Sequence, residues 1–370
     1  MANGRRTQPV LLVSLETPVV GSVDLPSAVY SRQPMQPRTH REMSHVIRPM
    51  SASANSRRAR LPTRAGVTPT SIRLIRDIYA EAKALDRPVM SIELFPPKTE
   101  KGNATLFDRT LPALQALGPD FYSVTYGAGG STRDKTLELA DAIQRRHQTT
   151  TMAHLTCIST PLADIGRYLD DARSRGIRNI LALRGDPPQA PEEHRSSGAG
   201  FEYSYQLVEF IRERSGFSIG TAGFPESHIA CPEGRHVDWQ RLKAKIDHGA
   251  DFVLTQLFFD NDDYFAFRDY LVGKLGVDVP LTPGVLPILS REQLTRFAAL
   301  CGATLPSSLL STLESFGDDT AAVADFGAEF ASRQCEVLLA GGAPGIHLYS
   351  LNRPEGATAI FEHLGLTGRS

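Results

Sequence analysis

From Thr68 onward, the chain alternates regularly between short apolar runs and longer amphipathic segments, and this alternation constrains the fold more than any other feature. Short apolar runs bounded by turn residues predict strands, and apolar residues spaced at three and four positions predict helices. The expected strands are 89–95, 120–126, 150–157, 178–184, 217–224, 251–259, 279–287 and 345–351. The expected helices lie near 104–117, 132–147, 161–175, 203–214, 235–248, 262–273 and 291–300, with more helix at 318–340 and 354–364.

Eight strands that are each followed by a helix give the count of a (β/α)8 TIM barrel, which we expect to occupy residues 68–370 as one catalytic domain. An extra helix at about 71–85 has no strand before it and is expected to cover the bottom of the barrel. The interval 302–344 holds two helical patterns where one would suffice.

An open doubly wound sheet is the rival architecture. In an open sheet the polar chemistry gathers at one switch point, whereas in a barrel it is spread over the C-terminal ends of many strands. Here it is spread, because polar residues end or follow six of the expected strands: Glu93, Thr125, His154, Asp186, Gln256 and Arg353. The pattern therefore favours the barrel.

Residues 1–67 have a different composition from the rest of the chain. Residues 1–65 contain ten arginines, no lysine and three acidic residues, and they are rich in serine and proline. Such a segment without apolar periodicity is expected to be disordered. Its arginine-rich character resembles that of an organelle transit peptide, so both a targeting role and a dispensable arm stay open. The expected location of the protein is the cytoplasm.

Bulk composition excludes several classes of function. Of 40 basic and 41 acidic residues, 30 and 38 remain after residue 65, and an acidic body argues against a nucleic-acid partner. No apolar run approaches the length of about 18 residues that a membrane-spanning helix needs. The four cysteines form no CxxC pair, so we expect a reducing compartment and no metal site.

Two motifs place charged residues at strand ends. In SIELFPPK, Glu93 interrupts an apolar strand; it is either paired with a buried cation or held in an apolar pocket, where a raised pKa would make it a general acid. In LALRGDPP, Gly185 permits close backbone approach and the following prolines stop strand pairing. Arg184 and Asp186 are therefore expected at the barrel mouth rather than on an exposed adhesion loop.

Three further signals are weaker. VTYGAGGSTRDKT joins a strand to a helix by a glycine-rich loop, but its spacing is neither GxGxxG nor GxxxxGKS, which disfavours a Rossmann unit. His154 lies on a strand and is read as either a core residue or a catalytic one. Asp238 and Lys245 are seven residues apart on one expected helix and so share a face, which could be a plain surface or a ligand contact.

Taken together, the motifs resemble one known family. IELFPPK, SVTYGAGGS, HLTC, ALRGDPP, AGFPESH, TQLFFD, PGVLPI and LNR occur in the order and approximate spacing of methylenetetrahydrofolate reductase, over about residues 88–366. The resemblance implies a TIM-barrel flavoprotein that binds FAD noncovalently. It also implies reduction of 5,10-methylenetetrahydrofolate to 5-methyltetrahydrofolate with NADH or NADPH by ping-pong transfer, in one-carbon and methionine metabolism. Relatives form dimers or tetramers, so a homo-oligomer is expected.

The same resemblance assigns expected roles to individual residues. Glu93 matches the general acid, and Asp186 matches the acid near the flavin and pterin rings. Positions that contact FAD correspond to Thr125, His154, Leu183, Arg184, Gly185, Asp186, Tyr203, Ser204, Asp238 and Lys245. Positions that meet folate or the nicotinamide nucleotide correspond to Glu93, Gln256, Gln293, Phe297 and Arg353. Phe224 stands where some members have a flavin-side tyrosine, so one hydrogen bond to FAD is expected to be missing.

Two alternatives stay beside this reading: another FAD-dependent barrel oxidoreductase, such as one that acts on proline, and a non-catalytic folate- or flavin-binding regulator. The preference between NADH and NADPH is left open. The C-terminal regulatory domain of larger relatives is expected to be absent, and with it inhibition by S-adenosylmethionine.

Overall fold

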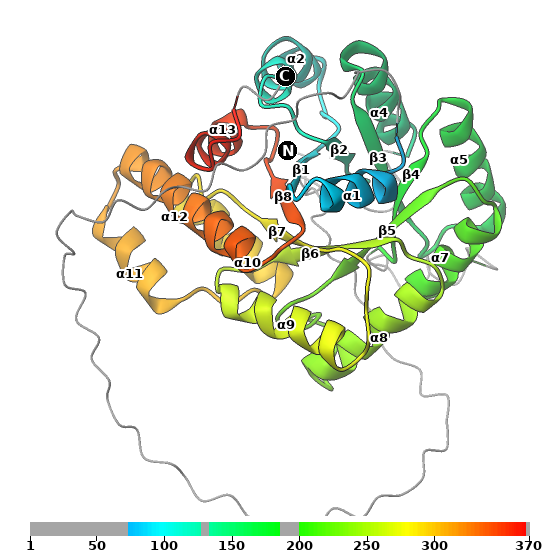
Figure 1. Cartoon of the computed structure of the whole chain (residues 1–370). Helices are drawn as coiled ribbons and strands as arrows, with labels where there is room; N and C mark the ends of the chain where they lie inside the picture. Colours follow the sequence, from blue (N-terminus) through cyan, green and yellow to red (C-terminus); the bar gives the residue numbers. More distant parts are fainter. Residues whose placement is uncertain (1–72, 127–132, 186–199, 368–370) are drawn as a thin grey trace, which may run out of the picture. The chain divides into compact units, whose positions relative to one another are not determined.

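The computed structural model describes residues 73–126, 133–185 and 200–367. Its parallel strands close into a barrel in chain order, from β1 to β8 and back to β1 (Figure 1). The strands are β1 (Val89–Leu94), β2 (Phe121–Val124), β3 (Thr150–Thr156), β4 (Asn179–Leu183), β5 (Ser218–Gly223), β6 (Phe252–Leu257), β7 (Leu281–Val285) and β8 (Gly345–Tyr349). All eight expected strands are present, so the predicted (β/α)8 TIM barrel is confirmed.

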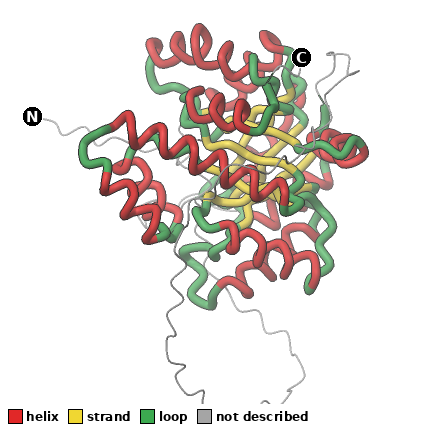
Figure 2. Tube along the Cα trace, turned by 60° about the vertical axis from the view of Figure 1, so that its left-hand side comes forward, coloured by secondary structure: helices red, strands yellow, loops and turns green. Residues whose placement is uncertain are grey.

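Helices surround the strands (Figure 2). They are α1 (Ile75–Ala84), α2 (Glu100–Thr105), η1 (Leu106–Thr110), α3 (Leu111–Gln115), α4 (Arg133–His147), α5 (Leu162–Ser174), α7 (Ser204–Glu213), α8 (Arg235–Asp247), α9 (Asn261–Gly273), α10 (Arg291–Cys301), α11 (Ser307–Ser315), α12 (Thr320–Ala340) and α13 (Pro354–His363). The two helical patterns of the interval 302–344 are α11 and α12. Within the described residues, no helix combines the length and the apolar character that crossing a membrane requires.

The helix after β1 differs from its prediction, which began at residue 104. It begins instead at Glu100, because the side chain of Thr99 accepts a hydrogen bond from the Gly102 N–H and caps the first turn. The residues of α2 are all at least partly exposed, so no apolar period marks them in the sequence. η1, which follows directly, is one π-helical turn.

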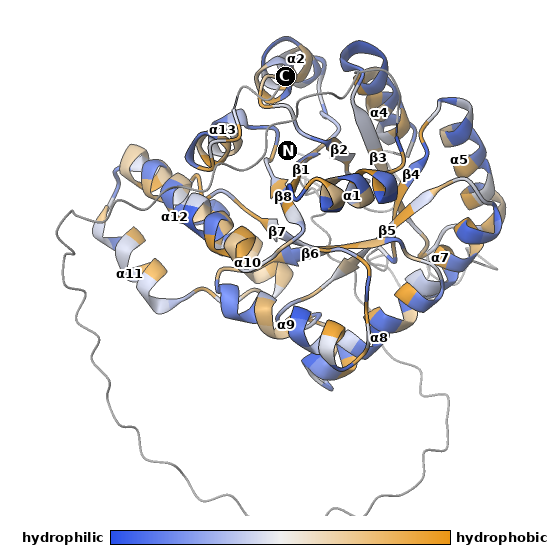
Figure 3. Ribbon diagram, in the orientation of Figure 1, coloured by the Kyte–Doolittle hydropathy of each residue, from blue (hydrophilic) through white to orange (hydrophobic). Residues whose placement is uncertain are grey.

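Every residue of the barrel strands is buried except Thr156, at the end of β3, because one strand face packs on the helices and the other faces the barrel interior. One apolar cluster joins the outward strand faces to the helices, and it includes Ile92, Val124 and Leu348. A second cluster fills the barrel interior, and it includes Val89, Phe121 and Phe252. Hydrophobic and hydrophilic residues accordingly alternate along the surrounding helices (Figure 3).

Helix α1 covers the end of the barrel where the strands begin, as predicted. Its first turn has backbone N–H groups without helical partners, and side chains of the strand starts satisfy them. Ile75 N donates to Asn179 Oδ1 at 2.8 Å, and Arg76 N donates to Ser218 Oγ at 3.1 Å. On the next turn, Tyr79 reaches into the barrel and its hydroxyl lies 2.6 Å from Thr282 Oγ1. The opposite end, where the strands finish, is left for the functional site.

Candidate active site

A buried carboxyl near the C-terminal end of one strand lies close to the imidazoles of two others. Glu93 is near the end of β1, His154 on β3 and His347 on β8. Glu93 Oε2 is 3.7 Å from His154 Nε2 and 3.8 Å from His347 Nε2. These separations are longer than hydrogen bonds but short enough for electrostatic coupling between buried groups.

The carboxyl of Glu93 is fully buried, with 0% of its surface exposed. Neither of its oxygens has a hydrogen-bond partner among the described residues. Burial raises the pKa of the Glu93 carboxyl, and the neighbouring His347 offsets part of that rise. A buried cation, which was the alternative reading of this residue, would hold the pKa down instead. The environment therefore favours the protonated form of this carboxyl.

Serine hydroxyls orient both imidazoles. His154 Nε2 shares a hydrogen bond of 2.6 Å with Ser123 Oγ on β2. His347 Nδ1 shares one of 2.8 Å with Ser91 Oγ on β1, which leaves His347 Nε2 directed toward the carboxyl. Burial, together with the nearby His347, lowers the pKa of His154 to about 3, so His154 is neutral at physiological pH.

The sequence prediction missed His347, Ser91 and Ser123. GIHLYSL carries a histidine at the same strand parity as Tyr349, and inward parity was the signal that could have found it. Finding these residues also requires the register between β1 and β8, in which Ser91 pairs with His347 and Glu93 pairs with Tyr349. A strand pattern does not reveal which distant strand will be the neighbour.

The turn after β4 explains the ALRGD motif in part. Gly185 has φ +84°, and a Cβ placed on it would come within 2.8 Å of Thr156 Cβ, so a side chain fits poorly here. The carbonyl of Arg184 accepts hydrogen bonds from Ile158 N at 2.8 Å and Cys157 N at 3.1 Å. These bonds hold the turn against the end of β3. Asp186 itself lies outside the described residues.

The side chain of Arg184 is buried beside this turn. Its Nε donates to the Glu202 carbonyl at 2.9 Å, and its guanidinium lies 5.9 Å from the centre of the Tyr203 ring. Arg184 Nη1 is buried and makes no hydrogen bond within the part of the chain that the structure describes. The next residue after Tyr203, Ser204, begins α7 and is buried. Three expected FAD positions are therefore neighbours in space.

Asp238 and Lys245 lie on one buried face of α8, as their spacing predicted. Asp238 Oδ2 accepts a hydrogen bond from His228 N, and Lys245 Nζ donates to the carbonyl of Ala222 on β5 at 2.9 Å. Lys245 thus fixes the end of β5, and Asp238 fixes the segment that follows it. In that segment the ring of Phe224 packs edge-on against His228, with ring centres 4.5 Å apart. His228 is a further candidate that the sequence analysis did not select.

The remaining predicted residues fall into two groups. Thr125, Leu183, Gln256 and Phe297 are buried. Gln256 accepts a hydrogen bond from Leu257 N through Oε1, whereas its buried Nε2 has no partner among residues with described positions. Gln293 is half-buried near the start of α10, and Arg353 is exposed, with Nε 3.7 Å from Glu355 Oε2. Among the predicted site residues, the structure therefore brings two pairs together. Glu93 lies beside His154, and Arg184 lies beside Tyr203.

One buried cationic donor suits an anionic cofactor. Arg184 Nη1 makes no hydrogen bond within the described chain. Leaving such a buried donor unpaired costs about 1–3 kcal/mol, so a bound anion such as a pyrophosphate would relieve that cost. Arg184 therefore fits FAD.

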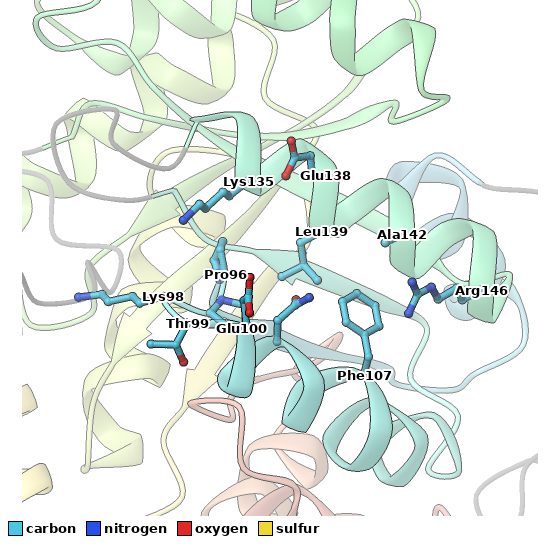
Figure 4. A pocket seen from close by; sticks show the side chains of 12 residues that line it. Pro96, Lys98, Thr99, Glu100, Phe107, Lys135, Glu138, Leu139, Ala142 and Arg146 are labelled. Atoms are coloured by element: carbon cyan, nitrogen blue, oxygen red, sulfur yellow. The ribbon is translucent and has the colours of Figure 1, made fainter.

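A surface groove of about 410 Å³ lies beside the loop that follows β1 (Figure 4). Pro96, Leu139 and Phe107 form apolar parts of its lining, and Lys98, Lys135 and Arg146 project around it together with Glu100 and Glu138. A second groove of about 590 Å³ lies between α10 and α11. None of the predicted site residues lines either groove, so the candidate site is the set at the strand ends.

A closed (β/α)8 barrel with a buried acid and imidazoles at the C-terminal ends of its strands has the architecture of an enzyme. The family model described as "Methylenetetrahydrofolate reductase" matches residues 78–365. The chain therefore belongs to the methylenetetrahydrofolate reductase family, whose members are oxidoreductases. The resemblance stated from the sequence motifs is confirmed.

Individual relatives agree with this assignment. "Methylenetetrahydrofolate reductase (NADH) 1" of Arabidopsis thaliana is 40% identical over 290 residues, which are 76% of this chain and 49% of the relative. "5,10-methylenetetrahydrofolate reductase" of Escherichia coli (strain K12) is 35% identical over 279 residues, covering 75% of this chain and 90% of the relative. The chain thus spans about half the length of the plant relative and most of the bacterial one.

A solved structure supports the fold. An uncharacterized protein from Clostridium thermocellum, described as binding two copies of 5-methyl-5,6,7,8-tetrahydrofolic acid, superposes with a TM-score of 0.53 at 15% identity. The superposition covers 77% of this chain and 97% of that protein.

Proposed function

We propose that this protein reduces 5,10-methylenetetrahydrofolate to 5-methyltetrahydrofolate with electrons from NADH or NADPH, using FAD as the hydride carrier. The observation that carries the proposal is the buried Glu93 carboxyl, whose oxygens have no hydrogen-bond partner in the described chain and whose pKa is raised. The substrate's methylene group is held in a five-membered ring. It becomes a hydride acceptor only when that ring opens to an iminium ion.

Ring opening gives Glu93 its task. One C–N bond of the ring breaks, its electron pair stays on the leaving nitrogen, and that nitrogen needs a proton. A carboxyl whose raised pKa favours its protonated form can supply it. The resulting carboxylate would stay in a site where its negative charge stabilises the iminium cation. Glu93 combines the two requirements because burial, and not a cationic partner, dominates its environment.

His347 is placed beside the acid. Its Nε2 faces the Glu93 carboxyl at 3.8 Å, and its Nδ1 is hydrogen-bonded to Ser91 Oγ. The bond to Ser91 would hold the imidazole in this orientation while Glu93 gives up its proton. His154 stays neutral and keeps its hydrogen bond to Ser123, so it shapes the pocket without adding a positive charge that would disfavour the iminium ion.

Several residues would hold the flavin. Arg184 and Lys245 would neutralise its pyrophosphate, and Thr125, His154, Leu183, Gly185, Tyr203, Ser204 and Asp238 would complete its binding site. Bound FAD supplies a ring that accepts a hydride from the nicotinamide and gives it to the folate, which makes the reaction ping-pong. Phe224 presents only its ring at this site, so it contributes packing but no hydroxyl hydrogen bond.

The other predicted residues would act on the substrates. Asp186 would place a carboxylate near the iminium, and the free Nε2 donor of Gln256 would bind a polar edge of the folate. The ring of Phe297 offers a face for stacking. Gln293 and Arg353 would contact the outer part of folate or of the nicotinamide nucleotide, with the charge of Arg353 suited to a carboxylate or a phosphate.

The wider setting is part of the same proposal. The reaction belongs to one-carbon and methionine metabolism in the cytoplasm, and the enzyme works as a homo-oligomer. Residues 1–67, proposed as a dispensable arm, lie within residues 1–72, which are outside the described residues. The plant relative is named for NADH, so NADH is the first reductant to test.

Anaerobic mixing tests the proposal. The purified protein should show an FAD absorbance spectrum that bleaches with NADH or NADPH, and the colour should return when 5,10-methylenetetrahydrofolate is added. A protein that bleaches but is reoxidised only by another acceptor, such as a cyclic imine, would point to a different barrel oxidoreductase. A protein that binds no flavin would contradict the proposal.

A further inference from the structure

The segment Leu351–Asn352, which follows β8, has an uncommon backbone conformation. Leu351 has φ +53° and Asn352 has φ +59°, so two successive residues other than glycine are left-handed. Residues with side chains rarely adopt this conformation, and such strain is kept only where the surroundings enforce it. The following Pro354 starts α13 and restricts Arg353 to an extended backbone. Pro354 therefore restricts the backbone directly after the two left-handed residues.

The side-chain amide of Asn352 bonds to both backbone groups of Phe95. Phe95 N donates to Asn352 Oδ1 at 2.8 Å, and Asn352 Nδ2 donates to Phe95 O at 2.8 Å. The register between β1 and β8 ends at the pair Glu93 and Tyr349. The amide thus continues the pairing of β1 with β8 beyond the last strand residues, and it can do so only because the left-handed turn points it at Phe95.

Two more hydrogen bonds tie the same region together. Ser350 Oγ donates to the carbonyl of Glu93 at 2.7 Å, and Thr110 Oγ1 donates to the carbonyl of Asn352 at 3.3 Å. Glu93 and His347 lie on the two strands that these contacts join. The separation between the Glu93 carboxyl and His347 therefore depends on how the ends of β1 and β8 are held.

We infer that Asn352 is a positioning residue: its paired hydrogen bonds to Phe95 hold the end of β1 so that the Glu93 carboxyl faces the leaving nitrogen of the substrate. The inference rests on the proposed function of Glu93. Proton transfer is sensitive to placement, and a misplacement of about 1 Å can cost about 100-fold in rate. Hydride transfer from the nicotinamide makes no use of this proton.

Asn352→Gly is the test variant. Glycine accepts the left-handed backbone without strain, so the substitution removes the amide while relieving strain. Leu351→Gly is a comparison variant: it adds the same backbone freedom one residue earlier and leaves the amide in place, and it also removes a partly buried side chain that packs against the barrel-interior cluster. Glu93→Gln removes the acid itself.

Three measurements on the flavin-loaded proteins distinguish the roles. In Asn352→Gly, reduction of methylenetetrahydrofolate by the reduced enzyme should slow by about 10- to 100-fold, while flavin reduction is unchanged. Hydrogen exchange at the Phe95 amide should accelerate, because its acceptor is gone. The melting temperature should move by less than about 4 °C, since strain relief offsets the lost hydrogen bonds. Leu351→Gly keeps the acceptor for the Phe95 amide, so it should keep the slow Phe95 exchange.

Each contrary result has a distinct meaning. If Glu93→Gln slows folate reduction and Asn352→Gly does not, Asn352 has no positioning role. If both half-reactions of Asn352→Gly slow equally, the amide only supports the fold. If Glu93→Gln itself leaves folate reduction intact, the acid role in the proposed function fails, and the inference fails with it.

Discussion

His154 should make the protein sensitive to acid, and the size of the effect follows from its burial. Its pKa is lowered from 6.5 to about 3 in the folded protein, mainly by burial and further by His347. In the unfolded chain the same imidazole takes up a proton at its ordinary pKa. A lowered pKa contributes stability above pH 6.5 that is lost as the pH falls toward 3.

The magnitude follows from linkage. Each pH unit between the two pKa values costs about 1.4 kcal/mol in the free energy of unfolding. Between pH 7.5 and 4.5 the pH passes through about two units below the unfolded-state pKa of 6.5, so His154 alone should account for a loss of about 3 kcal/mol. His154→Gln keeps a polar group for Ser123 and does not titrate, so that variant should lack this part of the acid sensitivity.

Urea unfolding at pH 7.5 and 4.5, with the same flavin content in both proteins, measures the difference. A constant cost of the substitution cancels, because only the change between the two pH values is compared. The stability of the wild type should fall by about 3 kcal/mol more than that of His154→Gln. Equal falls in the two proteins would refute the reasoning, and would mean that His154 is hydrated or protonated in the folded state.

Three further predictions concern the ends of the barrel and the arm. Asn179→Ala removes three hydrogen bonds, to Ile75 N, Arg73 O and Thr151 O, and should lower the free energy of unfolding by about 3 kcal/mol in urea, whereas Asn103→Ala on exposed α2 should change it little. A protein that starts at Thr68 should keep its FAD and its melting temperature; loss of flavin or precipitation would mean that the arm is structural. Asp186→Asn should slow folate reduction more than flavin reduction in stopped-flow measurements, and unchanged folate kinetics would remove Asp186 from the mechanism.

The barrel was predictable from the sequence because each strand is a short apolar run and each helix has its own period. The same local signals placed α1 beneath the strands and Asp238 with Lys245 on one face of α8. Helix α2 was not predictable in this way, because its polar residues carry no apolar period and its start depends on the cap from Thr99.

The site was predictable only where a residue contradicted its local pattern. Glu93 stood out as a charge in an apolar strand. His347 did not, because its importance depends on the pairing of β1 with β8, and Ser91 and His347 are 256 residues apart in the chain. The role of Asn352 likewise depends on the left-handed turn at residues 351 and 352, which the sequence LNR does not predict. Long-range register is the information that a single sequence lacks.

The two half-reactions of Glu93→Gln test the central claim most directly. Glutamine keeps the shape of the side chain and removes the acidic proton. The variant should still bind FAD and should bleach with NADH or NADPH within about tenfold of the wild-type rate, while folate reduction falls by at least about 100-fold, as expected for loss of a general acid. Equal losses in both half-reactions would show that Glu93 positions the flavin or maintains the fold, and no loss in either would show that the proton comes from another group.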